Sequence, residues 1–215
     1  MLNFVGLGLY DERSVTVAGR DAIQSADAVF AEFYTSHLVA ATVQDLETYH
    51  DVSIDVRDRA GVEQDPEPIL AAAEEGEAAF LTAGDPSVST THVDLRLRAH
   101  DRGIETRLYQ APTAQTAASG LTGLQSYRFG KATTIPFPRV HGGDGVPTSV
   151  VETIQENRSR GLHTIAYLDI KAEAEGMLPG EEAASLLATH WRGDVLGVVV
   201  GQAGSPSPTV QADRL

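Results

Sequence analysis

The chain has 215 residues, of which 42% are hydrophobic, and it carries 30 acidic against 16 basic side chains and no cysteine. This length and apolar content suffice for one large or two small domains with packed cores and exclude a disordered or fibrous chain. The missing cysteines exclude disulfides and thiolate chemistry, and the net charge of −14 works against binding to nucleic acids and to membrane surfaces.

Short apolar runs alternate with segments of helical length in the first half of the chain. The pattern predicts strands over 2–7, 28–33, 52–56, 78–82 and 104–109, and helices over 15–25, 37–47, 66–75 and 90–100. Alternating strands and helices at this spacing predict a five-stranded parallel sheet that is covered on both faces.

This alternation breaks near Ala111-Pro112, where a segment rich in Gly and Thr leads into an irregular stretch with three prolines and three glycines over 132–147. We place a domain boundary here, between an N-terminal α/β domain (1–110) and a C-terminal α/β domain (111–215). The second domain is predicted to contain helices over 148–160 and 180–191, strands over 164–168 and 195–200, and a short final segment over 208–211.

Two glycine-containing turns follow predicted strands of the first domain. The first, GLGLYD over 6–11, lacks the third glycine of a dinucleotide fingerprint, because Asp11 stands in its place. Its alternative interpretation is a turn that only lets a strand meet a helix. The second, LTAGDPSV over 81–88, places Asp85 at the carboxyl end of a strand, where parallel sheets bind ligands. Asp85 is equally suited to an Asx turn that caps the next helix, and both interpretations stay open.

Other catalytic and metal-binding patterns are missing. The seven histidines include no i,i+4 pair, so we expect no metal site, and no G-x-S-x-G elbow is present. The glycosylation sequon at Asn157-Arg158-Ser159 is interpreted as a chance match on a helix, and Trp191 as a core anchor. No run reaches the roughly 18 apolar residues of a membrane span, and the N-terminus lacks the basic region of a signal peptide, so we expect a cytoplasmic protein.

Several longer strings resemble the diphthine synthase family of the tetrapyrrole-type methyltransferases. They are GLGLYDERSVTV, FAEFYTS, LTAGDPSVSTTH, TGLQSYRFGKATT, RGLHTIAYLDIKAE and AGSPSPTVQADRL, and they span nearly the whole chain. The resemblance implies two α/β domains, with an N-terminal parallel sheet, a smaller C-terminal mixed sheet, and the cofactor in a cleft between them. It implies methylation by S-adenosylmethionine of the amino group of the modified histidine on elongation factor 2, a step of diphthamide synthesis that yields S-adenosylhomocysteine, by a homodimer.

The same resemblance carries the cofactor contacts onto seven positions of this sequence and names no catalytic side chain. These positions are Leu9, Asp85, Val88, Thr113, Ala114, Leu168 and Ala203. The sequence departs from the family pattern at Ala83, Thr113-Ala114 and Gly201-Gln202. Family members also continue past Leu215 with a strand and a cofactor-contacting histidine, so we expect an exposed edge in the second sheet.

Two other functions remain as alternatives to this enzyme. One is a tetrapyrrole methyltransferase of the same fold, and the other is a truncated, non-catalytic paralogue that binds only the cofactor or a partner. The loop over 137–147 is a hypothetical contact for a protein substrate. Because Lys131 and Lys171 are the only lysines, the acidic composition also indicates adaptation to a saline cytoplasm, with an ordinary acidic protein as the alternative.

Overall fold

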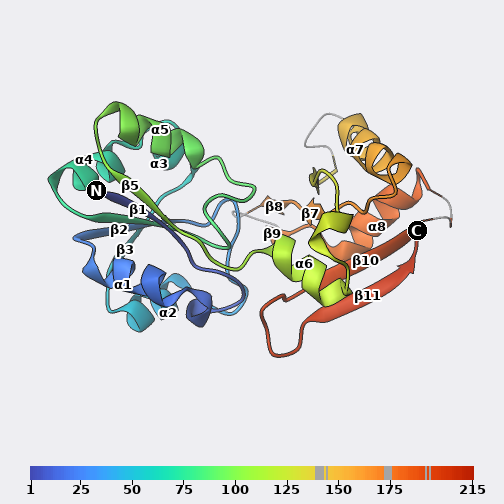
Figure 1. Cartoon of the computed structure of the whole chain (residues 1–215), viewed down its shortest axis with the longest axis horizontal. Helices are drawn as coiled ribbons and strands as arrows, with labels where there is room; N and C mark the ends of the chain where they lie inside the picture. Colours follow the sequence, from blue (N-terminus) through green and yellow to red (C-terminus); the bar gives the residue numbers. More distant parts are fainter. Residues whose placement is uncertain (139–142, 144, 172–175, 192, 194) are drawn as a thin grey trace. The chain divides into compact units, whose positions relative to one another are not determined.

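The computed structural model describes residues 1–138, 143, 145–171, 176–191, 193 and 195–215. By their internal contacts these residues form two compact units (Figure 1), one of residues 1–114 with 204–206, and one of residues 115–203 with 207–215. Residues 139–142 and 144 of the hypothetical substrate loop lie outside the described residues.

The first unit is built on a five-stranded parallel sheet in the order β3-β2-β4-β1-β5. Its strands are β1 (Leu2–Gly6), β2 (Ala28–Glu32), β3 (Ile54–Val56), β4 (Ala78–Thr82) and β5 (Thr106–Tyr109). Its helices are α1 (Val17–Ser25), α2 (Val43–His50), α3 (Arg59–Glu63), α4 (Glu67–Glu75) and α5 (Val93–Asp101). The predicted parallel α/β sheet is confirmed.

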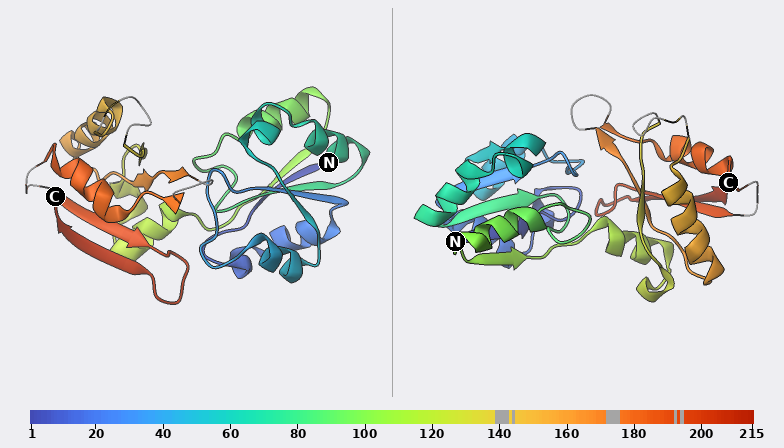
Figure 2. Two further views of the ribbon diagram at one scale, coloured as in Figure 1. Left: turned by 180° about the vertical axis from the view of Figure 1, so that it is seen from behind. Right: turned by 90° about the horizontal axis from the view of Figure 1, so that it is seen from above.

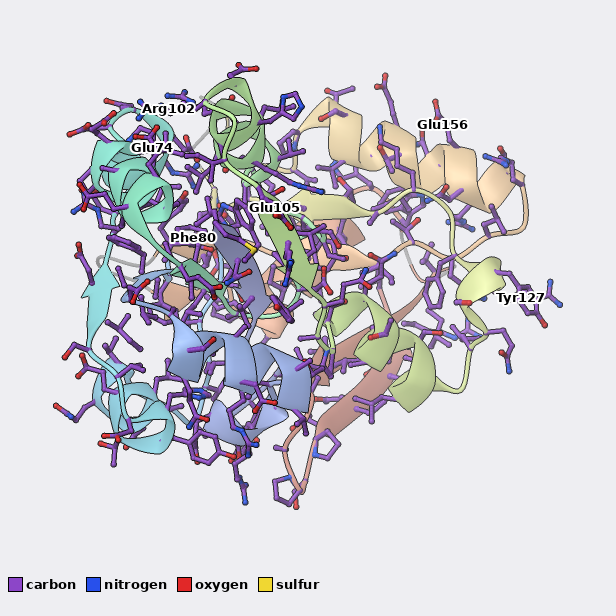
Figure 3. All side chains as sticks on the ribbon, turned by 60° about the vertical axis from the view of Figure 1, so that its left-hand side comes forward. Glu74, Phe80, Arg102, Glu105, Tyr127 and Glu156 are labelled. Atoms are coloured by element: carbon purple, nitrogen blue, oxygen red, sulfur yellow. The ribbon has the colours of Figure 1, made fainter. Side chains whose placement is uncertain are left out.

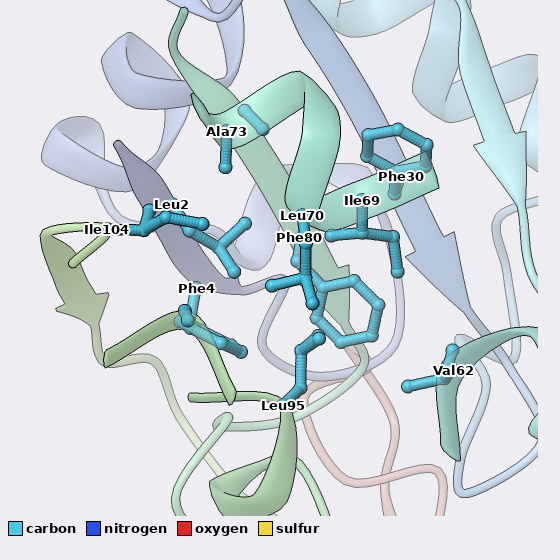
Figure 4. Close-up of a cluster of buried hydrophobic side chains, with 12 residues drawn as sticks. Leu2, Phe4, Phe30, Val62, Ile69, Leu70, Ala73, Phe80, Leu95 and Ile104 are labelled. Carbon is cyan, nitrogen blue, oxygen red and sulfur yellow. The ribbon is translucent and has the colours of Figure 1, made fainter. Parts of the chain in front are cut away.

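Alternating side chains of the central strands fill two cores, one on each face of this sheet. Phe4 and Phe80 pack edge to face, with ring centroids 5.9 Å apart, in the core under α4 and α5 (Figure 4). Val5 and Leu81, which point to the opposite face, belong to the core under α1 and α2. Figure 1 and the view from behind in Figure 2 show these two helical layers with the sheet between them.

The start of α2 differs from the prediction of a helix over 37–47. The Thr42 hydroxyl accepts a hydrogen bond from the Asp45 amide, and the Asp45 carboxylate accepts one from the Thr42 amide. This capping box begins the helix at Val43, and the helix continues to His50. The short helix α3, which Asp58 caps, was not predicted.

The second unit contains three two-stranded sheets and three helices around one core. Strands β6 (Thr133–Ile135) and β7 (Ala166–Leu168) pair in parallel, and two other pairs are antiparallel, namely β8 (Ile170–Lys171) with β9 (Gly176–Met177) and β10 (Leu196–Gly201) with β11 (Thr209–Arg214). The helices are α6 (Ala114–Thr122), α7 (Thr148–Ser159) and α8 (Gly180–Ala188). The sheets of this unit are thus small and of both kinds, as the fold class predicted.

The second unit confirms the prediction for Trp191, buries the asparagine of the glycosylation sequon, and contains two elements that were not predicted. Trp191 is buried in the core with residues of α7 and α8, which confirms it as a core anchor. Asn157 of the sequon is 2% exposed, so its amide is not available to a glycosylating enzyme. Helix α6 and strand β6 were not predicted, because their Ala-, Thr- and Gly-rich sequence lacks a clear apolar period.

Charged side chains pair on the outside of the first unit. The guanidinium of Arg102 lies 2.6 Å from the Glu67 carboxylate and 3.6 Å from that of Glu74 (Figure 3). A cavity of about 440 Å³ is lined by Arg102, Glu67, Arg98 and their neighbours on α4 and α5, and by none of the predicted cofactor residues. Within the described residues, no helix is long and apolar enough to cross a membrane.

Candidate functional site

The candidate site lies at the carboxyl edge of the parallel sheet, where β1 and β4 are neighbours. The chain leaves β1 toward α1 on one face of the sheet and leaves β4 toward α5 on the other face. Neighbouring strands whose connections leave on opposite faces open a crevice at their carboxyl ends, which is the usual ligand position in such sheets. The two glycine-containing turns that the sequence analysis singled out both lie at this point.

Glycines hold the two turns in close contact. Gly8 and Gly84 form an antiparallel bridge, with N–O distances of 3.1 and 2.8 Å. Two residues before Gly8, a Cβ atom on Gly6 would lie 2.5 Å from the Gly84 carbonyl oxygen and 2.8 Å from the Ala111 Cβ. Because no real side chain tolerates these distances, Gly6 is required for the ends of β1, β4 and β5 to converge.

Asp85 uses both of its carboxylate oxygens to hold this arrangement. Oδ1 accepts hydrogen bonds from the amide and the hydroxyl of Ser87, and Oδ2 accepts one from the Ala111 amide at 2.9 Å. The first set forms an Asx turn, as one of the two interpretations expected, but the turn does not cap the next helix, because α5 begins after His92 without a side-chain cap. Asp85 is 5% exposed, and both oxygens of its carboxylate are occupied by the protein.

Strained backbone is concentrated in the segments predicted to bind the cofactor. Four non-glycine residues of the described chain have positive φ, and Asp51 is one of them, at the end of α2. The other three are Tyr10 (φ 72°) after β1, Ser89 (φ 55°) after β4 and Gln202 (φ 51°) after β10. Such conformations cost free energy and gather at functional sites, so the three segments share a property that folding alone does not require.

The first unit contains five of the seven predicted cofactor residues, namely Leu9, Asp85, Val88, Thr113 and Ala114. Leu9 follows the β1 turn, and its amide donates to the Ser14 hydroxyl at 2.9 Å. Gly204 of the first unit packs so closely on Leu9 that an added Cβ would lie 2.8 Å from the Leu9 Cβ. Thr113 is buried directly before α6, and Val88 is half-buried.

The remaining two predicted residues belong to the second unit. Leu168 ends β7, pairs in register with Ile135 of β6 and is half-buried. Asp169, which follows it, accepts a hydrogen bond from the Phe137 amide at 3.3 Å. Ala203 follows the strained Gln202 and is half-buried. Residues 172–175, which include the end of the LDIKAE string, lie outside the described residues.

One buried polar pair, formed by Glu32 and His92, was not predicted from the sequence. The Nε2 atom of His92 lies 2.9 Å from the Oε1 atom of Glu32, and both side chains are at most 1% exposed. Glu32 belongs to the string FAEFYTS and His92 to STTH. An acidic residue inside an apolar strand sequence, AVFAEF, was the available signal, because a buried carboxylate requires hydrogen-bond donors.

Three comparisons with known proteins agree with one another. The family model of tetrapyrrole (corrin/porphyrin) methylases matches residues 1–213. A diphthine synthase of Halobacterium salinarum is 66% identical over 220 residues, with all of this chain and 85% of that protein covered. A diphthine synthase of Haloquadratum walsbyi is 65% identical, with all of this chain and 82% of that protein covered. A crystal structure of diphthine synthase superimposes with a TM-score of 0.90 at 32% identity and covers 99% of this chain and 81% of its own.

Proposed function

Because this chain belongs to the diphthine synthase family of the tetrapyrrole methylases, and so is a methyltransferase, we propose that it transfers a methyl group from S-adenosylmethionine to elongation factor 2. The acceptor is the amino group of the modified histidine in diphthamide biosynthesis. The observation that carries the proposal is the joint presence of the family's strings and of three residues with positive φ, each directly next to a position that the resemblance assigns to the cofactor.

The residues of the first unit fit such a cofactor. Gly84 has a φ of +73°, and no described atom outside its chain neighbours lies within 4 Å of the place where its Cβ would stand, so the turn leaves open space at this residue. Leu9 and Val88 supply apolar surface, and the buried Thr113 supplies a polar side chain. Open space beside a few apolar side chains and a polar group is typical of a small-molecule site.

S-adenosylmethionine would supply a methyl group that its sulfonium already activates. The chain's own task is therefore to bind and orient the cofactor and to keep water away, since alignment provides most of the rate acceleration in such a transfer. We propose that Leu9, Asp85, Val88, Thr113 and Ala114 do this in the first unit, and that Leu168 and Ala203 do so in the second.

The amino group that accepts the methyl group must be unprotonated when it reacts. The Asp85 carboxylate is a poor base for this proton, because its two oxygens already accept hydrogen bonds from Ser87 and Ala111. We therefore assign Asp85 the role of shaping the turn, and we propose no catalytic side chain.

The amino-acid composition supports a high-salt environment for this activity. The net charge of −14 and the two lysines favour a protein that stays hydrated at high salt, and relatives with the highest identities named above come from Halobacterium and Haloquadratum. We propose that the protein acts in a saline cytoplasm, where elongation factor 2 works, and that it forms a homodimer.

The experiment that tests the proposal has two steps. S-adenosylmethionine is first titrated calorimetrically into the purified protein in molar potassium chloride, and one site per chain is expected. Elongation factor 2 carrying the unmethylated precursor is then added with the cofactor, and a mass increase of the modified histidine is followed by mass spectrometry. Binding without any methylation would favour the non-catalytic paralogue, and methylation of a tetrapyrrole instead of the protein would favour the related family.

A further inference from the structure

The Glu32 carboxylate is the centre of a buried hydrogen-bond cluster at the end of β2. Its Oε2 atom accepts from the amides of Tyr34 and Thr35, at 3.1 and 3.0 Å. Its Oε1 atom accepts from three side chains, namely the hydroxyls of Thr35 (2.5 Å) and Thr82 (2.7 Å) and the imidazole of His92 (2.9 Å). Five donors thus converge on one side chain that is completely buried.

These donors keep Glu32 ionised. Burial alone would raise the pKa of Glu32, but the hydrogen bonds from His92, Thr35 and Thr82 outweigh it and lower the pKa below its ordinary value. An ionised carboxylate has only acceptors, so the Nε2 atom of His92 must carry the proton in this contact. All five contacts of the carboxylate are therefore ones in which Glu32 accepts.

Two of the donors stand at the two ends of a single loop. Thr82 is the last residue of β4, and His92 directly precedes α5. Because both donate to the Oε1 atom of Glu32, one oxygen atom joins the ends of the loop 83–91. This loop contains Asp85 and Val88, two of the predicted cofactor residues, and the strained Ser89.

The interior of the loop is held mainly by local contacts. The Val88 amide donates to the Asp85 carbonyl at 3.1 Å, and the Thr90 hydroxyl donates to the Pro86 carbonyl at 2.9 Å. One longer-range contact, from the Thr91 hydroxyl to the Glu63 carboxylate of α3 at 2.9 Å, is solvent-exposed. The local contacts move with the loop and do not fix it on the sheet. The anchors to the sheet are the Gly8–Gly84 bridge, the contact of Asp85 with Ala111, and the joined ends at Glu32.

We propose that Glu32 is a positioning residue, whose carboxylate closes the loop 83–91 at its base and holds it in the conformation that binds the cofactor. The proposal rests on the proposed function, since it assigns a role to the loop that would hold S-adenosylmethionine. It also assigns a structural role to two of the family's strings, because FAEFYTS contains the acceptor Glu32 and STTH contains the donor His92.

The first variant is Glu32→Gln, which keeps the shape of the side chain but replaces one acceptor oxygen by an NH2 group. Donors that now face that group lose their acceptor, and the loop loses its closure. We expect the Kd for S-adenosylmethionine to rise by about tenfold or more, a change of about 1.4 kcal/mol. The matched control is Leu46→Ala, which removes core packing on α2 of the same unit and leaves every hydrogen bond to Glu32 in place.

A second pair of variants tests the donor. His92→Leu removes the donor, and His92→Gln keeps an N–H at about the position of Nε2, so the first is expected to weaken binding and the second to retain most of the affinity. All Kd values are measured by calorimetry at a temperature at which the variant is fully folded by circular dichroism. If Glu32 only stabilised the fold, two variants with the same loss of thermal stability should show the same change in Kd. Leu46→Ala would then weaken binding as much as Glu32→Gln does.

Hydrogen exchange separates this proposal from the proposed function, since it requires no ligand. Amides of residues 84–91 are expected to exchange faster in Glu32→Gln and His92→Leu than in the wild type, and at the wild-type rate in Leu46→Ala. If the wild type binds no S-adenosylmethionine, the proposed function fails, and the exchange rates still decide whether Glu32 closes the loop. Wild-type affinity and exchange in Glu32→Gln, or in His92→Leu should the first variant not fold, would overturn the proposal.

Discussion

The carboxylate of Asp85 accepts a hydrogen bond from the backbone amide of Ala111, which lies 26 residues later in the chain, at 2.9 Å. Ala111 stands between β5 and the first residue of α6, so this bond fixes the segment that carries Thr113 and Ala114 to the turn after β4. One aspartate thus sets the geometry of two segments that the resemblance assigns to the cofactor, although they are distant in sequence.

The variant Asp85→Asn tests this hydrogen bond. The asparagine oxygen can replace Oδ1 toward Ser87, but its NH2 group would face the Ala111 amide, so two donors would oppose each other. We expect the free energy of unfolding to fall by about 1–3 kcal/mol and the affinity for S-adenosylmethionine to fall as well. Denaturant unfolding and calorimetry measure these two changes.

The control for this variant is the same substitution at the exposed Asp58, whose Oδ1 atom accepts a hydrogen bond from the Gly61 amide at the start of α3. Asn caps a helix about as well as Asp does, so Asp58→Asn is expected to change the free energy of unfolding little. Equal effects of the two variants would contradict the role that we assign to the contact between Asp85 and Ala111.

Substitution of Gly6 by alanine tests the convergence of the strand ends. The added methyl group would lie 2.5 Å from the Gly84 carbonyl oxygen, and backbone on both sides would have to move. We expect Gly6→Ala to lower the free energy of unfolding by about 1–3 kcal/mol and to abolish cofactor binding, as measured by denaturant unfolding and calorimetry.

Gly120→Ala is the matched control, since in α6 no described atom outside the helix's own backbone lies within 4 Å of the added Cβ. Alanine favours helix over glycine, so this variant is expected to gain about 0.5–1 kcal/mol. The two alanines should therefore shift stability in opposite directions, and a Gly6→Ala protein as stable as the wild type would show that the strand ends can separate without cost.

The sequence predicted the first sheet well and the site only in part. Strand β4 was predicted with its observed bounds, because an apolar run stands between Gly76 and the Gly84 turn. The predicted start of this helix at residue 37 was wrong, because the capping box of Thr42 and Asp45 begins α2 at Val43. For Asp85 both interpretations stayed open, because an Asx turn and a ligand site require the same residue.

The sequence shows that Glu32 is an acidic residue in an apolar strand, but not which residues donate to it. Its partners Thr82 and His92 are 50 and 60 residues away, and no local pattern connects them. Only the pairing of β2 with β4 brings them together. The missing information is the order of the strands in the sheet, which periodicity does not contain.

Acid sensitivity is expected from His50. Its side chain is completely buried, and among the described residues neither ring nitrogen has a hydrogen-bond partner. Burial, and next the charge of Arg20, lower the pKa of His50 below 6.5. The unfolded chain therefore binds a proton at a higher pH than the folded chain does, and stability falls as the pH drops below about 6.5, with a slope of up to about 1.4 kcal/mol per pH unit.

Denaturant unfolding between pH 5 and 8 measures this slope. His50→Leu should remove the contribution of this residue and flatten the profile below pH 6.5. His100→Leu is the control, because His100 lies on the surface with its side chain 86% exposed, and its profile should follow that of the wild type. Glu32 contributes in a lower range, since its pKa lies below 4.5 and its stabilisation is lost only as the pH falls through that value. An unchanged slope in His50→Leu would exclude His50 as the source.

Asn157 of α7 holds the segment before β6, which contains Gly130 and Lys131, by hydrogen bonds. The Asn157 amide accepts from the Lys131 amide at 3.2 Å and donates to the Lys131 carbonyl and the Thr164 hydroxyl, both at 2.8 Å. A Cβ on Gly130 would lie 2.0 Å from the Oδ1 atom of Asn157. Gly130→Ala and Asn157→Ala are each expected to destabilise the unit, the latter by roughly 2–4 kcal/mol for three lost hydrogen bonds.

A double-mutant cycle shows whether Gly130→Ala destabilises the unit through its clash with Asn157 or independently of it. Because Asn157→Ala removes the atom that the new methyl group would strike, the double variant should lose less than the sum of the single variants, with a coupling of about 0.5–3 kcal/mol. Gly120→Ala in the Asn157→Ala background is the control and should be additive, since its Cβ meets no neighbour. The cycle is measured by denaturant unfolding. Additivity of Gly130→Ala with Asn157→Ala would mean that the loop before β6 moves aside freely, so that Asn157 does not hold it in place.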